Sequence, residues 1–578
     1  MVNADAEGFN VHRRQHRSFR FGEEVEIRRS PQAVACRKRY AVELGKPRRA
    51  PAVGTAMERY TGIQVLRHMK GKPENGTRLE PAPLWENHEP GGREDHAKMG
   101  PIAISPRGVL SGIVLRGWES QPHGEGPDGS TQPAKETCAG HAGSEQRKPT
   151  SLRGIAHRAK SNKHHRFRNL YQSLTAESLM DSWHDLNKNA ASGVDKVTAQ
   201  AYQENLEGNL QDLADRLKTK RYRAKLIRRC YIPKENGKQR PLGIPALEDK
   251  LVQLACAKVL TAIYEQDFLD NSYAYRPNRS ARDAVADLTF NLQYGQYGYL
   301  VEADIKGFFD NMNHDWILDM LALRIDDKAF INLIHKWLKA GILETDGKII
   351  DPETGSPQGG IVSPILANIY LHYGLDLWFE KVVKRHCRGK AMICRYADDY
   401  VCAFQFKDDA ERFYRTQPRR LHKFGLEVAS DKTQIIRFSR FHPSMTRRIT
   451  FLGFELYWFV DHNKEARVMR RTARKKLQGA CRRIKEWIRE NRHLPGPEFI
   501  KGLNRRLRGH YNYYGLRGNQ KSLERFYKWA MKCVFKWLNR RGGKRKSFTW
   551  DAFNRALERV GVAIPMVKEK QRRHRVYA

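Results

Sequence analysis

The chain is poor in cysteine and in acidic residues, and it contains no long apolar run. Its nine cysteines among 578 residues are odd in number and scattered, with no Cys-x-x-Cys pair. This pattern is typical of reduced thiols in a cytosol-like compartment and argues against a structural zinc site. No stretch approaches the roughly 18 consecutive apolar residues of a membrane helix, and the N-terminal residues mix Glu and Arg without an apolar core. We therefore expect no transmembrane helix, no secretory signal and no membrane partner.

The shortage of acidic residues leaves a large positive charge. Lys and Arg number 105 against 64 Asp and Glu, which gives a net charge of +41 at pH 7 and a pI near 10.0. A protein this basic needs a polyanionic partner or a strong reason to avoid association. Nucleic acid is the leading candidate.

Composition divides the chain near residue 150. Residues 1–150 contain 18 of the 44 Gly and 13 of the 25 Pro, with little periodic apolar patterning. We expect this basic N-terminal extension to be poorly ordered, either as a solvated tail or as a segment that folds on RNA. The chain as a whole is long enough for three or four domains with a sizeable core.

Two adjacent carboxylates lie in the middle of an apolar, aromatic-rich run, residues 393–404. The run reads as two short strands joined by a tight turn at Ala397-Asp398-Asp399. Burying these charges costs several kcal/mol unless a partner neutralises them, and a divalent metal ion is the natural candidate. The alternative is an ordinary hairpin turn, because Asp is a common turn residue.

A third carboxylate, Asp304, lies at the end of the predicted strand at residues 299–305. Together with Asp398 and Asp399 it could hold two Mg²⁺ ions about 4 Å apart, the arrangement used for in-line displacement at phosphorus. Phe309 lies five residues further on. A ring beneath the sugar of an incoming nucleotide would clash with a 2′-hydroxyl and favour deoxynucleotides, whereas the alternative is a core phenylalanine.

Two further segments contain candidate contacts to the incoming nucleotide. Residues 228–245 read as strand, Asn-Gly turn and strand. Such a hairpin would bring Lys234, Lys238 and Arg240 close enough to bind a triphosphate. The alternative is a solvated basic hairpin. The Gly- and Pro-rich loop at residues 355–364 allows backbone to approach a base and sugar, with Gln358 as a hydrogen-bonding side chain, and it leads into a predicted helix at residues 365–379.

Basic and aromatic residues interleave at residues 273–280, just before a helix predicted to start near Ser280. Arg276 and Arg279 could contact template bases and phosphates, or they could simply pack and cap the helix.

Six motifs in a fixed order resemble the reverse transcriptases encoded by group II introns. They are Arg240-Pro241-Leu242-Gly243-Ile244-Pro245, Tyr275-Arg276-Pro277-Asn278-Arg279, Ala303-Asp304-Ile305-Lys306-Gly307-Phe308-Phe309, Ser356-Pro357-Gln358-Gly359-Gly360, Tyr396-Ala397-Asp398-Asp399 and Phe451-Leu452-Gly453-Phe454. The resemblance implies an α+β fold, that of a right-hand polymerase with fingers, a palm with an antiparallel sheet, and a helical thumb, followed by a C-terminal helical maturase domain.

The same resemblance implies a domain plan and site residues. Residues 151–298 would form the N-terminal helical segment and fingers, residues 299–460 the palm, and residues 461–578 the thumb and maturase RNA-binding domain; the reverse transcriptase domain would span about residues 215–456. Asp304, Asp398 and Asp399 would be the catalytic Mg²⁺ ligands. The expected nucleotide-binding residues are Lys234, Arg240, Phe309, Gln358 and Lys432, the last also a candidate general acid towards pyrophosphate.

The C-terminal region is strongly basic. Residues 470–546 contain 25 Lys or Arg against 4 Asp or Glu, with apolar positions at helical spacing. Such helices suit a surface that follows a phosphate backbone. Residues 508–515 resemble the signature of the family's maturase domain. The predicted RNA-binding residues are Arg276, Arg279, Arg505, Arg506, Arg508, Tyr511 and Tyr514, with a core position as the alternative for the two tyrosines.

We therefore predict an RNA-directed DNA polymerase that is also an intron maturase. Its expected partners are group II intron RNA, an RNA template with a DNA primer, target DNA and deoxynucleoside triphosphates, in a cytoplasmic ribonucleoprotein. No endonuclease domain is expected, because the sequence after residue 565 has no Cys pairs. The alternatives are a non-catalytic RNA-binding splicing factor and a reverse transcriptase with a defence role.

Overall fold

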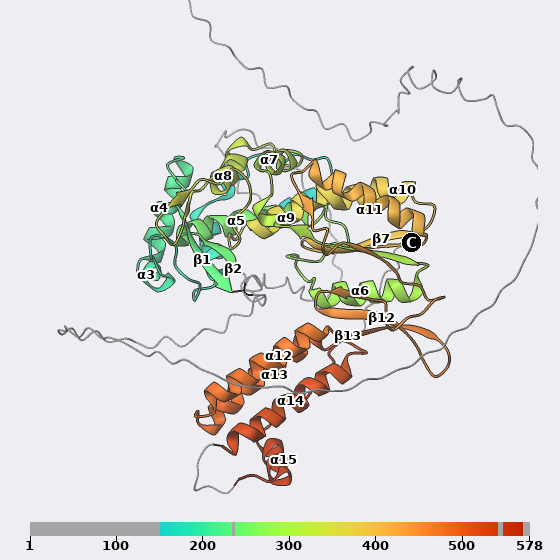
Figure 1. Cartoon of the computed structure of the whole chain (residues 1–578). Helices are drawn as coiled ribbons and strands as arrows, with labels where there is room; N and C mark the ends of the chain where they lie inside the picture. The colour runs from blue at the N-terminus through green and yellow to red at the C-terminus, as the bar shows by residue number, and fades with distance from the viewer. Residues whose placement is uncertain (1–150, 234–236, 238, 541–546, 570–578) are drawn as a thin grey trace, which may run out of the picture. The chain divides into compact units, whose positions relative to one another are not determined.

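The computed structural model describes residues 151–233, 237, 239–540 and 547–569. The expected N-terminal extension at residues 1–150 lies outside them, as do Lys234 and Lys238. The described elements mix helices with sheets whose strands are antiparallel except for the parallel pair β1–β5 (Figure 1). No helix in these ranges is both long and apolar enough to cross a membrane.

A four-stranded antiparallel sheet holds the carboxylate motifs. Its order is β10 (Gln434–Arg437), β3 (Tyr299–Ala303), β8 (Asp399–Phe404) and β7 (Ala391–Tyr396). Strands β7 and β8 form the predicted hairpin, in which Tyr396 pairs with Asp399. Both strands are buried almost throughout, as expected of strands with both faces covered.

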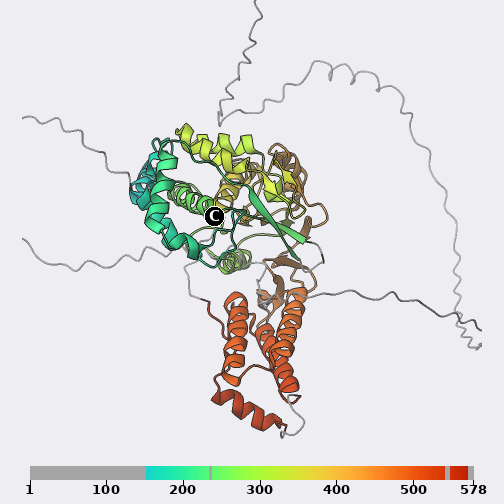
Figure 2. The same cartoon turned by 90° about the vertical axis from the view of Figure 1, so that its left-hand side faces the viewer.

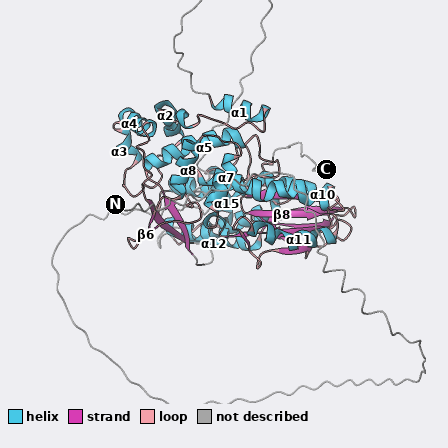
Figure 3. Ribbon diagram, turned by 90° about the horizontal axis from the view of Figure 1, so that it is seen from above, coloured by secondary structure: helices cyan, strands magenta, loops and turns pink. Residues whose placement is uncertain are grey.

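Helices cover the two faces of this sheet. Helix α11 (Lys407–His422) lies against one face and α6 (Ala281–Tyr294) against the other (Figure 1). Figure 3 shows α11 and β8 close together, seen from above. Side chains alternate along the strands, so Cys402 and Phe404 belong to the core on the α11 side of the sheet, and Val401 and Ala403 belong to the core on the α6 side. Helix α6 starts where predicted, because Ser280 and Asp283 form a reciprocal capping box.

The N-terminal described residues are mainly helical. Helices α1 (Leu152–Ser161) and α2 (Ala176–Asp185) pack on the buried helix α5 (Leu247–Tyr264), and α3 (Ala199–Gln203) and α4 (Leu206–Lys218) lie beside α2. A second sheet has the order β2 (Gln239–Ile244), β1 (Ile227–Pro233), β5 (Ile342–Leu343) and β6 (Ile349–Ile350). Its β1–β2 pair is antiparallel, as the sequence predicted.

Short elements connect this part to the main sheet. They are β4 (Ile305–Lys306), which pairs with β9 (Glu427–Val428), the 3₁₀ turn Phe308–Asp310, α7 (His314–Ala322) and α8 (Lys328–Leu338). The helix predicted at residues 365–379 starts earlier, as α9 (Ser363–Leu371). It then widens into π-helical turns at His372–Asp376 and Phe379–Val383 before α10 (Lys384–His386).

The C-terminal described residues form a third sheet and a helical group. Strands β11 (Arg448–Phe451), β12 (Phe454–Val460) and β13 (Ala466–Thr472) are antiparallel, and their buried face shares a core with α6. Helices α12 (Arg474–Asn491), α13 (Gly496–Tyr514), α14 (Gln520–Leu538) and α15 (Trp550–Arg559) have a separate core (Figure 2).

Candidate active site

The tip of the β7–β8 hairpin presents the paired carboxylates. Ala397 adopts a left-handed conformation, with φ of 57°, directly before Asp398. A non-glycine residue in this region is strained, so surrounding contacts must hold the turn. Asp398 is half-buried and Asp399, the first residue of β8, is exposed.

A buried arginine supplies one of these contacts. Arg395 donates from Nη1 to the Ala397 carbonyl at 3.1 Å, and its Nε and Nη2 donate to Asp376 at 2.7 and 2.6 Å. Both charged side chains are 0% exposed. Arg395 also donates to Ser272 Oγ at 2.8 Å and to Asn368 Oδ1 at 3.3 Å. The sequence reasoning missed Arg395, although a charged residue inside a buried apolar strand is itself a signal of a fixed partner.

Asp304 lies at the same edge of the sheet as the hairpin tip. It follows Ala303, which pairs with Tyr400 on the neighbouring strand. Burial raises the pKa of Asp398, and the negative charge of Asp304 adds to this effect, while Arg240 opposes it. Lys432 forms an ion pair with Asp304, and that hydrogen bond raises the pKa of the lysine.

The carboxylates fit a divalent cation through two of the three predicted ligands. Asp304 and Asp398 are hard oxygen donors whose mutual repulsion raises the pKa of Asp398, and a cation between them would relieve it. Within the described ranges, however, no group of three or more His, Cys, Asp or Glu side chains is gathered for a metal. The structure therefore does not gather Asp399 with the other two into a three-residue metal cluster.

The glycine-rich loop brings the candidate nucleotide contacts together. The Gly243 amide donates to the Gln358 carbonyl at 2.7 Å, which joins the loop to β2, the strand of Arg240. A Cβ on Gly359 would lie 2.4 Å from the Gly243 oxygen, and the φ of 123° also requires glycine there. The Ser356 amide donates to the Phe309 carbonyl at 2.8 Å.

The two phenylalanines after Asp304 have different environments. Phe308 is buried, with its ring 6.3 Å from that of Tyr370, and therefore occupies the core position. Phe309 is half-buried and contacts Phe308 edge-on, with ring centroids 5.4 Å apart. The alternative reading of the sequence was that Phe309 is a core residue. In the structure the fully buried position is that of Phe308, and Phe309 is only half-buried.

Two family profiles match the parts of the chain that contain these features. The profile for reverse transcriptase (RNA-dependent DNA polymerase) covers residues 232–456, and that for the maturase-specific domain of group II introns covers residues 477–556. The chain is 33% identical over 309 residues to the Escherichia coli protein YkfC, a match covering 48% of this chain and 78% of YkfC. It is also 42% identical over 188 residues to the group II intron-encoded protein LtrA of Lactococcus lactis subsp. cremoris.

The chain belongs to the group II intron reverse transcriptase and maturase family. The LtrA match covers 32% of this chain and 30% of LtrA. A 91 kDa protein in the cob intron of Schizosaccharomyces pombe is 37% identical over 302 residues, which cover 51% of this chain and 36% of that protein. The chain thus spans about a third of the length of these two relatives. The reverse transcriptase match confirms the predicted enzyme class, RNA-directed DNA polymerase, at the level of the domain.

One further residue of this group II intron family member lies close to the carboxylates. Tyr275 has a φ of 58° and is half-buried. Burial raises the pKa of its hydroxyl, and the charges of Asp398 and Asp399 add to the shift, while Arg240 opposes it. Tyr275 begins one of the six family motifs but was not predicted as a site residue. Its left-handed backbone conformation cannot be predicted from the sequence.

The two predicted RNA contacts beside Tyr275 are bound within the protein. The side chain of Arg276 is 3% exposed and donates to Glu265 and to the carbonyls of Leu269 and Ser272. The prediction that Arg276 contacts RNA is therefore wrong for this conformation, because its donors are already occupied. Arg279 is half-buried and donates to the carboxylate and the carbonyl of Asp270.

The maturase candidates divide in a similar way. Arg505 and Arg508 are exposed on α13, whereas Arg506 lies over the ring of Trp487, 4.1 Å from its centroid. Tyr511 is 3% exposed within the helical core, so its alternative core role holds and the predicted RNA contact is wrong. Tyr514 is half-buried, with its ring 5.2 Å from that of Phe454.

Proposed function

We propose that this protein copies an RNA template into DNA from a DNA primer and also binds group II intron RNA as a maturase. The observation that carries the proposal is the approach of Asp304 and Asp398 at one sheet edge within the matched reverse transcriptase region. Converging carboxylates are costly in a protein that only binds RNA, since nothing in such a role requires them.

A right-hand arrangement accounts for the order of the elements. Residues 151–298 correspond to the N-terminal helical segment and fingers, residues 299–460 to the palm, and residues 461–578 to the thumb and maturase domain. The antiparallel sheet with Asp304 and the β7–β8 hairpin suits a palm. The basic helices α12 to α14 suit a surface that follows a nucleic acid backbone.

The site residues have distinct roles in this proposal. Asp304 and Asp398, with Asp399 as the third predicted ligand, would hold Mg²⁺, which supplies charge stabilisation for nucleotidyl transfer when two ions are bound. Arg240 and Lys432 attract the triphosphate of the incoming deoxynucleotide. Phe309 excludes a 2′-hydroxyl by its bulk.

The maturase role accounts for the rest of the charge. Arg505 and Arg508 are exposed on α13, inside the region that matches the maturase profile. Arginines of this kind bind RNA phosphates and stack on unpaired bases. The RNA partner is the group II intron, the DNA partner is the target into which it moves, and the complex is a cytoplasmic ribonucleoprotein.

Replacing Asp398 with Ala tests the polymerase role. We expect Asp398→Ala to abolish primer extension on an RNA template with deoxynucleotides while leaving RNA affinity, measured by filter binding, within about twofold of wild type. Asp346→Ala is the matched control, because Asp346 is exposed next to the β5–β6 hairpin. Extension by the Asp398→Ala protein at the wild-type rate would refute the assignment of the site.

Sequencing of the RNA that co-purifies with the full chain separates the biological roles. Recovery of an excised group II intron supports the maturase. Recovery of another structured RNA, together with active polymerisation, points instead to a defence role. Specific RNA recovery without any polymerisation by the wild-type protein supports a non-catalytic splicing factor.

A further inference from the structure

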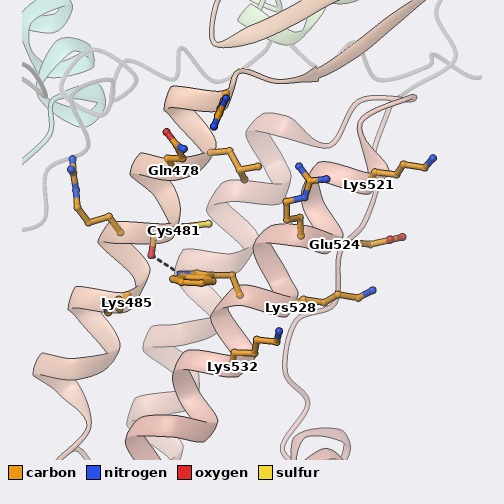
Figure 4. A pocket seen from close by; sticks show the side chains of 12 residues that line it. Gln478, Cys481, Lys485, Lys521, Glu524, Lys528 and Lys532 are labelled. Atoms are coloured by element: carbon orange, nitrogen blue, oxygen red, sulfur yellow. Dashed lines mark hydrogen bonds between the residues drawn. The ribbon is translucent and has the colours of Figure 1, made fainter. Parts of the chain in front are cut away.

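A basic groove lies between helices α12 and α14, and none of the residues predicted to bind RNA lines it. It has a volume of about 860 Å³ and is lined by side chains at positions three and four residues apart on both helices (Figure 4). Positions 474–485 and 521–532 each cover about 17 Å at the rise of an α-helix. At about 3.4 Å per stacked step, the groove has the length of about five nucleotides.

The groove walls are strongly cationic. Helix α12 contributes Arg474, Arg482 and Lys485, and none of the three forms an ion pair with a carboxylate in the described ranges. Figure 4 shows Gln478, Cys481 and Lys485 along this wall. Cationic side chains that form no ion pair are available to phosphates, and their binding releases counterions.

The opposite wall repeats this pattern. Helix α14 contributes Lys521, Arg525, Lys528 and Lys532, again without ion pairs to described carboxylates. Glu524 is the one acidic residue among those that line the groove, and it accepts a hydrogen bond from Gln520 on its own helix. Two rows of positive charge, one on each of the neighbouring helices α12 and α14, favour a polyanion that runs along the helix axes.

An aromatic ring lies between the two walls. Trp529 of α14 is 43% exposed, and its Nε1 donates to the Cys481 carbonyl of α12 at 3.1 Å (Figure 4). This bond links the helices and fixes the orientation of the indole, which reduces the entropy lost when a base stacks on it. The nearby side chains of Leu477 and Cys481 are apolar. A fixed, partly exposed ring between cationic rows combines the two features of a single-strand binding platform.

We propose that the groove binds an unpaired segment of the structured intron RNA, with one base stacked on Trp529 and adjacent phosphates on the lysines and arginines of both walls. An unpaired segment is required because the bases of a duplex are stacked on one another and cannot present a face to the ring. The groove residues from Leu477 to Lys532 lie inside the region that matches the maturase profile, which favours intron RNA over the template strand. The inference rests on the proposed maturase function.

Binding of fluorescent oligoadenylate, an unpaired RNA probe, to the full chain tests the proposal. Trp529→Ala should weaken this binding about tenfold, the typical effect of removing one stacking platform, whereas Trp529→Phe should retain most of it. Trp550→Ala is the matched control: Trp550 is 45% exposed on α15, but its ring stacks on Phe535 with centroids 3.9 Å apart. Thermal melting verifies that each variant is folded.

A salt titration provides a second measurement. Lys528→Gln combined with Lys532→Gln should reduce the slope of log affinity against log salt concentration by about 1.4, since each phosphate contact with a single strand contributes about 0.7. An unchanged slope contradicts the proposal, as does wild-type oligoadenylate affinity in Trp529→Ala. The proposal would also be overturned if Trp529→Ala weakened the binding of a blunt RNA duplex as much as it weakens the binding of oligoadenylate. The groove would then bind a double strand. Binding of polyglutamate that depends equally on Trp529 would indicate an acidic protein partner instead.

Primer extension by the wild-type protein separates this inference from the proposed enzyme. If the wild type polymerises and co-purifies with intron RNA but Trp529→Ala binds oligoadenylate normally, only the groove assignment fails. If oligoadenylate binding depends on Trp529 but no intron RNA co-purifies, the unpaired-strand site stands and the maturase function fails.

Discussion

The buried pair Arg395–Asp376 should be required both for stability and for the position of Asp398. Neither side chain is exposed, and Arg395 also donates to the Ala397 carbonyl in the strained turn before Asp398. Replacing Asp376 with Leu leaves a guanidinium buried without its counterion. Breaking a buried pair in this way typically costs about 3–5 kcal/mol, so urea unfolding should show a loss of that size.

Replacing both partners separates stability from position. In Arg395→Met with Asp376→Leu, no charge remains buried, so most of the lost free energy of unfolding should return. Only in this double variant does the Ala397 carbonyl lose its donor, so that the turn is free to relax from its left-handed conformation. A displacement of about 1 Å at a reacting group can reduce the rate about a hundredfold, so we expect primer extension to remain low by that factor.

The matched control is a second ion pair, in which the arginine is buried and the aspartate is half-buried. Arg324 and Asp267 are joined at 2.8 Å, and Arg324 also donates to backbone carbonyls, including that of His165. We expect Arg324→Met with Asp267→Leu to change stability without a comparable effect on primer extension by the folded protein. A doubly substituted Arg395 and Asp376 protein with both wild-type stability and wild-type extension would refute the positioning role.

Three other predictions concern single residues. Phe309→Val should increase ribonucleotide incorporation about tenfold or more relative to deoxynucleotides, measured by primer extension with each nucleotide set; unchanged sugar selectivity counts against the gate. Gly359→Ala should destabilise the protein by about 1–3 kcal/mol and raise the KM for nucleotides, because its Cβ would lie 2.4 Å from the Gly243 oxygen at a φ of 123°. Urea unfolding measures the first effect and nucleotide titration the second. Wild-type values in both measurements would contradict the prediction. Burial lowers the pKa of His510 from 6.5 to about 3, so below pH 6.5 the unfolded chain takes up a proton that the folded chain does not, and stability falls. His510→Phe keeps the stacking on Phe526 but removes the titrating ring. Between about pH 7 and pH 5, urea unfolding of this variant should therefore show a loss of unfolding free energy about 2 kcal/mol smaller than that of the wild type. An identical loss in both proteins would exclude His510 as a cause of the pH dependence.

Local sequence was sufficient for the elements that depend on near neighbours. The β7–β8 hairpin was predicted from two apolar runs joined by a short polar turn, and the β1–β2 hairpin from its Asn-Gly turn. The start of α6 was predicted from Ser280, whose side chain accepts from a backbone amide only three residues away. Turns and caps of this kind are determined by residues within a few positions.

The helix after the glycine-rich loop marks a limit of this reasoning. Its apolar run predicted a regular helix over residues 365–379, but the structure has π-helical turns at His372–Asp376 and Phe379–Val383. Asp376 pairs with Arg395 from another element. The π-helical turns accompany a contact to a residue that is remote in sequence, so the local sequence does not predict them.

The motifs by themselves determined the family and the residue types of the site, because their order along the chain is specific. Only the tertiary structure decided which of those residues meet. It brought Asp398 near Asp304, assigned Arg276 and Tyr511 to the interior, and revealed Arg395 beneath the turn. The same Arg in the same motif can face solvent or an internal carboxylate, and the choice depends on partners that are remote in sequence and are brought close only by folding.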